Sequence, residues 1–129
     1  MDNERMIRFT MGGMAFEYDE QKNRINLQKH GISFKSAARV FFDYDRIEFF
    51  DDEHSNDENR YDTIGDTSAG MVVHEIGNTL IGQINEILFV VYTERIHTDA
   101  NGKETDVTRL ISARLATSFE RGLYYGKYE

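Results

Sequence analysis

Two arginines lie along the strand part of one segment, Thr108 to Tyr125, in which an apolar strand pattern runs directly into a helix pattern. A guanidinium group stays charged and forks onto carboxylates or phosphates, so Arg109 and Arg114 need anionic partners in the folded chain. On a regular strand, five residues of separation place the two side chains on opposite faces and roughly 16 Å apart. One small site therefore uses both arginines only if a bulge intervenes.

A second group of reactive side chains follows in the run H-S-N-D-E-N-R at residues 54–60. His54 can move a proton near neutral pH, and Arg60 can bind a phosphate or stabilise a developing negative charge. The alternative is a solvated acidic loop in which Ser55 and Asp57 make turn hydrogen bonds and Arg60 pairs with a neighbouring carboxylate. Spacing alone favours this second interpretation.

Further polar residues lie on one predicted helix near the N-terminus. Lys22, Asn26 and Lys29 share a helical face by the i, i+4, i+7 rule. Such a face either contacts a phosphate backbone or is simply solvated, and the sequence favours neither. His30 is either a proton shuttle or, more simply, a cation favoured at a helix C-terminus by the helix dipole.

The elements that must position these residues begin with a short strand and two helices. Phe16–Tyr18 predicts the strand, and Asp19 is the N-cap of a helix that ends at Lys29, stopped by Gly31 at the C′ position. Ser33 begins a second helix with apolar residues at i, i+3, i+4 and i+7, which predict a core stripe: Phe34, Ala37, Ala38 and Phe41.

The rest of the chain predicts a sheet. Asn101-Gly102 is a two-residue hairpin turn, which would place Glu94 opposite Arg109. Residues 67–85 predict an extra hairpin or loop, with Gly77-Asn78 as its turn. The predicted strands are 46–50, 60–66, 87–92 and 106–113, of which 87–92 is apolar on both faces and is expected in the middle of the sheet.

A capping-box pattern, Thr117 with Glu120, predicts a last helix that begins near Ser118. Its spacing directs three side chains inward: Phe119, Leu123 and Tyr124. Together the elements predict an α+β fold, with an antiparallel sheet, two N-terminal helices and one C-terminal helix.

Length and composition are those of one globular domain. The chain has 129 residues, of which 40% are hydrophobic, so it can bury a substantial core. Residues 1–13 show no clean period and are expected to be a loose extension of a single domain at 14–129. The absence of Cys and of a long apolar run favours a reducing compartment, the cytoplasm, over a membrane or an exported location.

The net charge of −8 is concentrated in one segment. Residues 43–66 contain ten acidic residues against Arg46 and Arg60, which accounts for the whole net charge, whereas residues 1–42 carry a net +2. The surface outside this segment can therefore bind phosphate, and the acidic segment can attract a basic partner.

The sequence lacks the motifs of several common classes of site. The runs D-D-E-H and D-A-N-G lack the spacing of a calcium loop, so neither a metal nor a cofactor is expected. No phosphate-binding glycine loop, dinucleotide fingerprint or serine-hydrolase elbow is present.

Taken in order, four runs resemble the BrnT toxin family, the ribonuclease half of type II toxin-antitoxin pairs. They are F-E-Y-D-E-Q-K-N-R-I-N-L-Q-K-H-G-I-S-F at 16–34, H-S-N-D-E-N-R-Y at 54–61, V-Y-T-E-R at 91–95 and R-L-I-S-A-R-L-A-T-S-F-E-R at 109–121. The resemblance implies a compact RelE-like fold and translation arrest by RNA cleavage. It also implies neutralisation, in a hetero-oligomer, by a BrnA-like antitoxin with a ribbon-helix-helix domain.

The resemblance carries over a set of polar positions: Lys22, Asn26, Lys29, His30, His54, Glu58, Arg60, Glu94, Arg95, Arg109, Arg114, Thr117 and Glu120. Metal-independent RNA cleavage needs a base for the 2′-hydroxyl, cations for the phosphorane and a proton for the leaving oxygen. The hypothesis assigns phosphate stabilisation to Arg114 and Arg95, and proton transfer to Glu58 with His54 or His30. It assigns RNA binding to the remaining cations: Lys22, Lys29, Arg60 and Arg109.

A different class of function fits the same residues. In this alternative the chain is a non-catalytic binding module that keeps the toxin scaffold and acts only through a basic protein partner.

Overall fold

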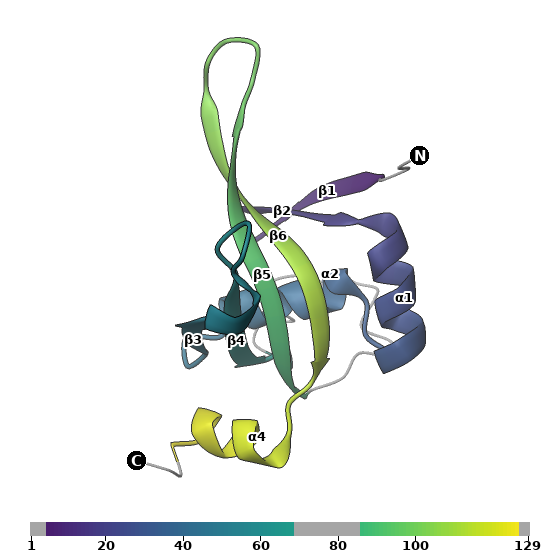
Figure 1. Ribbon diagram of the computed structural model, residues 1–129, viewed down its shortest axis with the longest axis vertical. Coiled ribbons are helices and arrows are strands. Elements are labelled where there is room, and N and C mark those ends of the chain that lie inside the picture. Colours follow the sequence, from purple (N-terminus) through teal and green to yellow (C-terminus); the bar gives the residue numbers. More distant parts are fainter. Residues whose placement is uncertain (1–4, 69–85, 127–129) are drawn as a thin grey trace.

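The computed structural model describes residues 5–68 and 86–126. Its elements in chain order are β1 (Met6–Met11), β2 (Met14–Asp19), α1 (Glu20–His30), α2 (Phe34–Ala37), the 3₁₀ helix η1 (Ala38–Phe42), β3 (Ile47–Phe50), the 3₁₀ helix η2 (Asp52–His54), β4 (Tyr61–Asp66), β5 (Ile87–Thr98), β6 (Glu104–Leu115) and α4 (Ser118–Tyr124). The strands form one sheet in the order β1-β2-β6-β5-β4-β3 (Figure 1). The α+β class is confirmed, and β5 lies inside the sheet as expected.

The sheet is mixed, so the expectation of an antiparallel sheet is wrong at one pairing. Strands β2 and β6 run parallel, with Phe16 opposite Thr108, while every other described pair is antiparallel. Parallel neighbours need a crossover connection. Here the connection from β2 to β6 is long: it begins with α1 and includes β3, β4 and β5.

The N-terminal segment is an edge strand, so the expectation of a loose extension over residues 1–13 is wrong for residues 6–11. Strand β1 pairs with β2 through the two-residue turn Gly12-Gly13, and both glycines have positive φ. Three alternating residues of β1 pack against the core: Ile7, Phe9 and Met11. The signal was present in the sequence, because a Gly-Gly pair between alternating apolar residues is a hairpin pattern.

Helix α1 has the predicted caps and ends at His30, one residue later than predicted. The side chain of Asp19 accepts a hydrogen bond from the N–H of Lys22, and Gly31 adopts φ 74° and donates to the carbonyl of Leu27. The second predicted helix is shorter than expected. Ser33 caps it as predicted, but only Phe34–Ala37 is α-helical before the chain tightens into η1.

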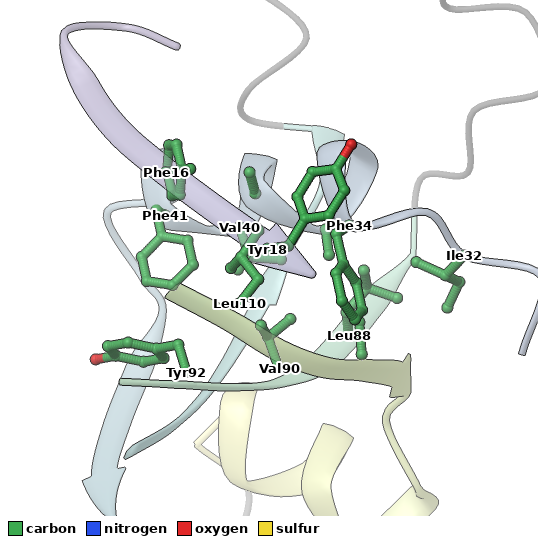
Figure 2. Packing of buried hydrophobic residues seen from close by; sticks show 13 residues of the cluster. Phe16, Tyr18, Ile32, Phe34, Val40, Phe41, Leu88, Val90, Tyr92 and Leu110 are labelled. Atoms are coloured by element: carbon green, nitrogen blue, oxygen red, sulfur yellow. The ribbon is translucent and has the colours of Figure 1, made fainter. Parts of the chain in front are cut away.

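The core lies between α2–η1 and one face of the sheet (Figure 2). The predicted stripe Phe34, Ala37, Ala38 and Phe41 is buried there and meets alternating residues of the strands. These strand residues are Phe16, Leu88, Val90, Tyr92, Leu110 and Ala113. Alternation sends the intervening residues to the opposite face, here called the open face.

Asn26 joins α1 to the sheet from a buried position. Ala113 lies on β6 past the residues that pair with β2. The side-chain amide of Asn26 donates to the carbonyls of Ile32 and Ala113 at 2.9 Å, and its oxygen accepts from the N–H of Ala113 at 3.1 Å. The amide thus substitutes for a neighbouring strand. The expected solvent-facing row of Lys22, Asn26 and Lys29 is therefore interrupted by a buried residue.

The hairpin between β5 and β6 closes differently from the prediction. Asp99 N–H bonds the carbonyl of Lys103, Gly102 N–H bonds that of Asp99, and Gly102 has φ 85°. A type I turn followed by a left-handed glycine adds one residue to the loop compared with a two-residue turn. Thr93, not Glu94, consequently lies opposite Arg109, and the expected Glu94–Arg109 cross-strand pair is wrong.

A bulge in β6 changes which side chains share a face. Val91 pairs with Ser112 and Tyr92 pairs with Leu110, so Ile111 is an extra residue. Arg109 and Arg114 then lie opposite Thr93 and Phe89, which are four residues apart on β5 and face the same way. The bulge therefore brings both arginines to the open face.

Helix α4 begins at the predicted residue, but one of the three side chains predicted to point inward is exposed. Thr117 and Glu120 form the full capping box. Tyr124 donates to the carboxylate of Asp43 at 2.5 Å, whereas Phe119, expected to point inward, is 60% exposed. Phe119 lies five residues before Tyr124, and at 100° per residue the two cannot share a face of a helix.

The predicted hairpin or loop at 67–85, with its Gly77-Asn78 turn, lies outside the described residues except for Thr67 and Ser68. In the part of the chain that the structure describes, no helix is long and apolar enough to cross a bilayer.

Replacing Asn26 tests its structural role. Asn26→Ala leaves buried backbone groups of Ile32 and Ala113 without partners, so the free energy of unfolding should fall by about 2–4 kcal/mol. Urea denaturation followed by circular dichroism measures this. Gln28→Ala, on the exposed side of α1, is the control and should change stability by less than about 0.5 kcal/mol. Equal stability of the two variants would contradict the role given to Asn26.

Candidate functional site

The open face carries most of the polar residues selected from the sequence. Strand β2 contributes Glu17, β4 contributes Asp62, β5 contributes Thr93 and Arg95, and β6 contributes Arg109 and Arg114 by the alternation described above. The segment between β3 and β4, which contains η2, folds back beside this face. The bulged, twisted strands and this segment leave hollows between them.

The central hollow, with a volume of about 410 Å³, brings three of the candidate residues together. Its lining includes His54 from η2, Arg60 from the segment before β4, and Arg114 from β6, together with Asp51 and Asp62. Of these residues, His54 and Arg114 lie 60 positions apart in the chain. A smaller neighbouring hollow is also lined by His54 and Arg60, and adds Glu58.

His54 is held by Asp51 at the start of η2. The carboxylate of Asp51 accepts from the backbone N–H of His54 at 3.2 Å and lies 3.0 Å from Nδ1 of the ring. These contacts lower the pKa of Asp51, outweighing the opposing effect of burial. An ionised Asp51 can only accept, so Nδ1 carries the hydrogen and Nε2 is left to accept a proton.

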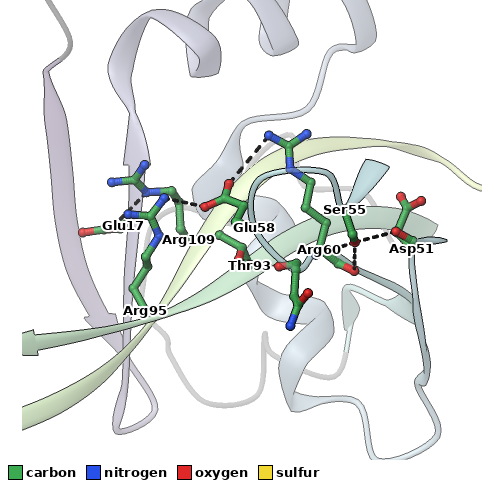
Figure 3. A network of polar contacts seen from close by, with 9 residues as sticks. Glu17, Asp51, Ser55, Glu58, Arg60, Thr93, Arg95 and Arg109 are labelled. Atoms are coloured by element: carbon green, nitrogen blue, oxygen red, sulfur yellow. Dashed lines mark hydrogen bonds and ion pairs between the residues drawn. The ribbon is translucent and has the colours of Figure 1, made fainter. Parts of the chain in front are cut away.

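Ser55 fixes the same segment. Its hydroxyl donates to the carbonyl of Asp51 at 2.6 Å and accepts from the N–H of Arg60 at 2.9 Å (Figure 3). The turn hydrogen bond expected of Ser55 in a plain acidic loop is thus present. It also sets His54 and Arg60 at one hollow, so the structural and the chemical interpretations of this segment are compatible.

Arg114 is oriented by α4 and by an aromatic ring. It forms a bidentate pair with Glu120 at 2.8 and 3.0 Å, and its guanidinium lies 4.2 Å from the ring centre of Phe89. The hydrogen bonds to Glu120 raise the pKa of Arg114 above its ordinary value. The side chain is still 37% exposed, so one side of the guanidinium is open to an anion.

A second hollow, the edge hollow, lies at the root of the β5–β6 hairpin and has a volume of about 550 Å³. Glu58 and Arg95 line it and form a 2.7 Å ion pair. Glu58 also lies 3.7 Å from Arg60, which connects the two hollows (Figure 3). Thr93 donates to the carbonyl of Asn59 at 2.6 Å and holds the segment against β5.

Arg109 has a structural partner. It donates to Glu17 at 2.9 Å, and the same carboxylate lies 3.1 Å from both Arg8 and His97. Burial alone would raise the pKa of Glu17, but the hydrogen bonds from Arg109 and Arg8 lower it. This fully buried carboxylate therefore joins β1, β2, β5 and β6.

The remaining candidates lie on α1. Lys22, Lys29 and His30 are exposed, with Lys29 and His30 in the last turn of the helix. None of the three lines the central hollow or the edge hollow. The structure thus places the candidate residues in two groups, one on the open face and one on α1.

Sequence reasoning missed Asp51 and Asp62. Both were counted as part of an acidic segment, although Asp62 lies in β4, between β3 and β5, and is only 7% exposed. A carboxylate inside a strand pattern, Y-D-T-I, is unusual and is the signal that was available. Among the described residues, no group of three or more His, Asp and Glu side chains is arranged to hold a metal ion.

Comparison with known proteins agrees with these observations. The family model described as the ribonuclease toxin BrnT of type II toxin-antitoxin systems matches residues 18–77. This match confirms the resemblance to that family, and it covers His54, Glu58 and Arg60 but not Arg95 or Arg114. No curated protein matches the chain. The family points to a toxin with ribonuclease activity, which implies an RNA substrate and an antitoxin partner.

The Glu17 cluster yields a pH-dependent prediction. Glu17→Gln removes the buried negative charge that pairs with Arg109 and Arg8, and the free energy of unfolding at pH 7 should fall by roughly 2–3 kcal/mol. The expected loss is smaller than for a fully buried ion pair because Arg8 is largely exposed. The folded-state pKa lies below the ordinary 4.5, so this stability is present above that value and is lost as pH falls through the folded-state pKa.

Urea denaturation at pH 7 and at pH 3 measures this difference for wild type and Glu17→Gln. The gap between the two proteins should narrow at the lower pH. Glu104→Gln, at an exposed position of the hairpin, serves as the control. A gap that is absent at pH 7, or that widens in acid, would show that Glu17 does not hold these strands.

Proposed function

We propose that this chain is the toxin of a type II toxin-antitoxin system, a metal-independent endoribonuclease that arrests translation by cleaving RNA in the central hollow. The observation that carries the proposal is the convergence of His54, Arg60 and Arg114 on one hollow of the open face. The family match supports the toxin and ribonuclease class. We further propose that the scaffold is RelE-like and that the protein acts in the cytoplasm.

The chemistry follows from the positions of the side chains. Nε2 of His54 accepts the proton of a ribose 2′-hydroxyl, and the 2′-oxygen forms a bond to the adjacent phosphorus. Arg114 and Arg60 stabilise the charge on the phosphorane oxygens. The bond between phosphorus and the 5′-oxygen breaks, the 5′-oxygen takes a proton from water, and His54 returns its proton to solvent. The products are a 2′,3′-cyclic phosphate and a 5′-hydroxyl.

The other candidates receive supporting roles. The pair of Glu58 and Arg95 borders the edge hollow, where it contacts the nucleotide next to the one cleaved. Arg109 supports the sheet through Glu17 and contributes positive charge to the open face. The exposed side chains of α1 bind the RNA backbone away from the chemistry: Lys22, Lys29 and His30.

A BrnA-like antitoxin with a ribbon-helix-helix domain is the proposed partner, in a hetero-oligomer that covers the open face. One observation also favours the non-catalytic alternative. Three arginines of the open face are paired with carboxylates of the chain itself, namely Arg114 with Glu120, Arg95 with Glu58 and Arg109 with Glu17. Such pairs lower the net positive potential available to RNA. Activity of the purified protein separates the two functions.

Cleavage of an end-labelled RNA by purified protein in the presence of EDTA tests the proposal. His54→Ala and Arg114→Ala should each lower the rate by about 100-fold or more, since each removes a proton-transfer or charge-stabilising group. A 2′-deoxy substitution at the cleaved nucleotide should block the reaction completely. The product should carry a 2′,3′-cyclic phosphate.

Lys103→Ala, an exposed cation at the hairpin tip, is the matched control and should retain full activity. Circular dichroism of each variant separates loss of activity from loss of fold. Undiminished cleavage by both His54→Ala and Arg114→Ala would reject the site. Absence of cleavage by wild type, with capture of a basic partner, would favour the binding module.

Co-expression tests the partner. A small basic ribbon-helix-helix protein encoded next to this chain should relieve the growth arrest that the toxin causes and should co-elute with it in gel filtration. Arrest that persists despite a stable complex would mean that the open face stays accessible in the hetero-oligomer, contrary to the proposal.

A further inference from the structure

Two carboxyl groups meet at the floor of the central hollow. Strands β3 and β4 pair in a register that places Phe49 opposite Asp62 and Phe50 opposite Tyr61. The register continues one step further, because the N–H of Asp51 bonds the carbonyl of Arg60 at 2.8 Å. Asp51 and Asp62 are therefore diagonal neighbours on the open face, a spacing that side chains bridge.

The surroundings of Asp62 explain why it keeps a proton. Its carboxyl is 7% exposed, and its buried Oδ1 has no hydrogen-bond donor among the described residues. Burial, together with a hydrogen bond to Asp51 and the charge of that residue, raises the pKa of Asp62 to about 7, against smaller opposing effects of His54 and Arg114. When two carboxyl groups are neighbours in a partly buried site, repulsion between their charges favours the state in which one of them is protonated.

The contacts then form a chain of hydrogen bonds. Asp62, as the protonated member, donates to Asp51, and Asp51, as the ionised member, accepts from Nδ1 of His54. We propose that Asp62 is a positioning residue for the proposed RNA cleavage: it fixes the ionised, oriented Asp51 that keeps the hydrogen of His54 on Nδ1 and leaves Nε2 free to accept the 2′-hydroxyl proton. This inference rests on the proposed function for its role in catalysis.

The chain of hydrogen bonds predicts how activity responds to pH. When Asp62 loses its proton, it can no longer donate a hydrogen bond to Asp51, and repulsion between the two carboxylates releases Asp51 from the orientation that keeps the hydrogen of His54 on Nδ1. The other charged groups that line the hollow are Glu53, Arg60 and Arg114. They surround Asp62 whether or not it carries its proton. Ionisation of Asp62 should therefore lower the rate on the alkaline side of neutrality.

Matched substitutions separate the hydrogen bond from the titration. Asp62→Asn keeps a donor toward Asp51 but cannot ionise, so its rate at pH 6 should stay within about threefold of wild type while the loss of rate above pH 7 disappears. Asp62→Ala removes the donor and should lower the rate at least about tenfold at every pH. Unchanged pH profiles in both variants would overturn the proposal.

Nuclear magnetic resonance reads the same groups without RNA. In wild type, one Asp side-chain carboxyl should titrate near neutral pH, and its signal should be absent from Asp62→Asn. In Asp51→Asn it should titrate at a lower pH than in wild type, while burial still keeps its pKa above the ordinary Asp value. Nitrogen shifts of His54 should report the Nδ1–H form in wild type and Asp62→Asn, and a mixture of forms in Asp62→Ala.

These readings distinguish two failures. If wild type cleaves no RNA, the proposed function fails, and the carboxyl and ring titrations still decide whether Asp62 holds His54 through Asp51. If RNA is cleaved but no Asp carboxyl titrates above pH 6, or the His54 ring does not respond to Asp62→Ala, the role assigned to Asp62 is wrong.

Discussion

The extra residue in β6 is the constraint on which the open face depends. Without Ile111, alternation would send Arg109 and Arg114 to opposite faces, and one of them would enter the apolar core. With it, the apolar residues Leu110 and Ala113 both remain in the core while both arginines face the same way. A single bulge thus satisfies burial and gathers charge, which agrees with the frequent occurrence of bulges beside functional sites.

Carboxylates rather than solvent set the positions of these arginines. Glu17 is completely buried and Glu120 is mostly buried, so each holds its arginine in one orientation. The strongly acidic composition is therefore partly structural. Asp43 illustrates this: it accepts from the N–H of Asp66 at 2.8 Å and from Tyr124, joining η1, β4 and α4. In the proposed function, the remaining exposed side of each guanidinium is what RNA phosphate meets.

Local sequence rules predicted the parts of the fold that local interactions determine. The caps of α1 by Asp19 and Gly31, the cap of α2 by Ser33 and the capping box of α4 were all visible as patterns. The length of the turn at Gly102 and the position of the bulge at Ile111 were not, because each depends on the register in which the neighbouring strands pair. The exposed position of Phe119 likewise follows from the contact between Tyr124 and Asp43.

The same distinction applies to the candidate site. His54, Arg60 and Arg114 were selected by their chemistry, and the structure brings them to one hollow, although nothing in their spacing required this. Asp51 and Asp62 were overlooked because a run of acidic residues resembles a solvated loop, and only strand pairing shows that two of them meet.

The central claim is that the phosphate at which the RNA is cleaved is bound in the central hollow, whereas α1 contacts the RNA backbone only away from the chemistry. Titration of isotope-labelled protein with a short 2′-O-methylated RNA, which cannot be cleaved by attack of the 2′-oxygen, tests this most directly. The account predicts that side-chain signals of His54, Arg60 and Arg114 shift first and saturate together. Shifts confined to Lys22, Lys29 and His30 would contradict it.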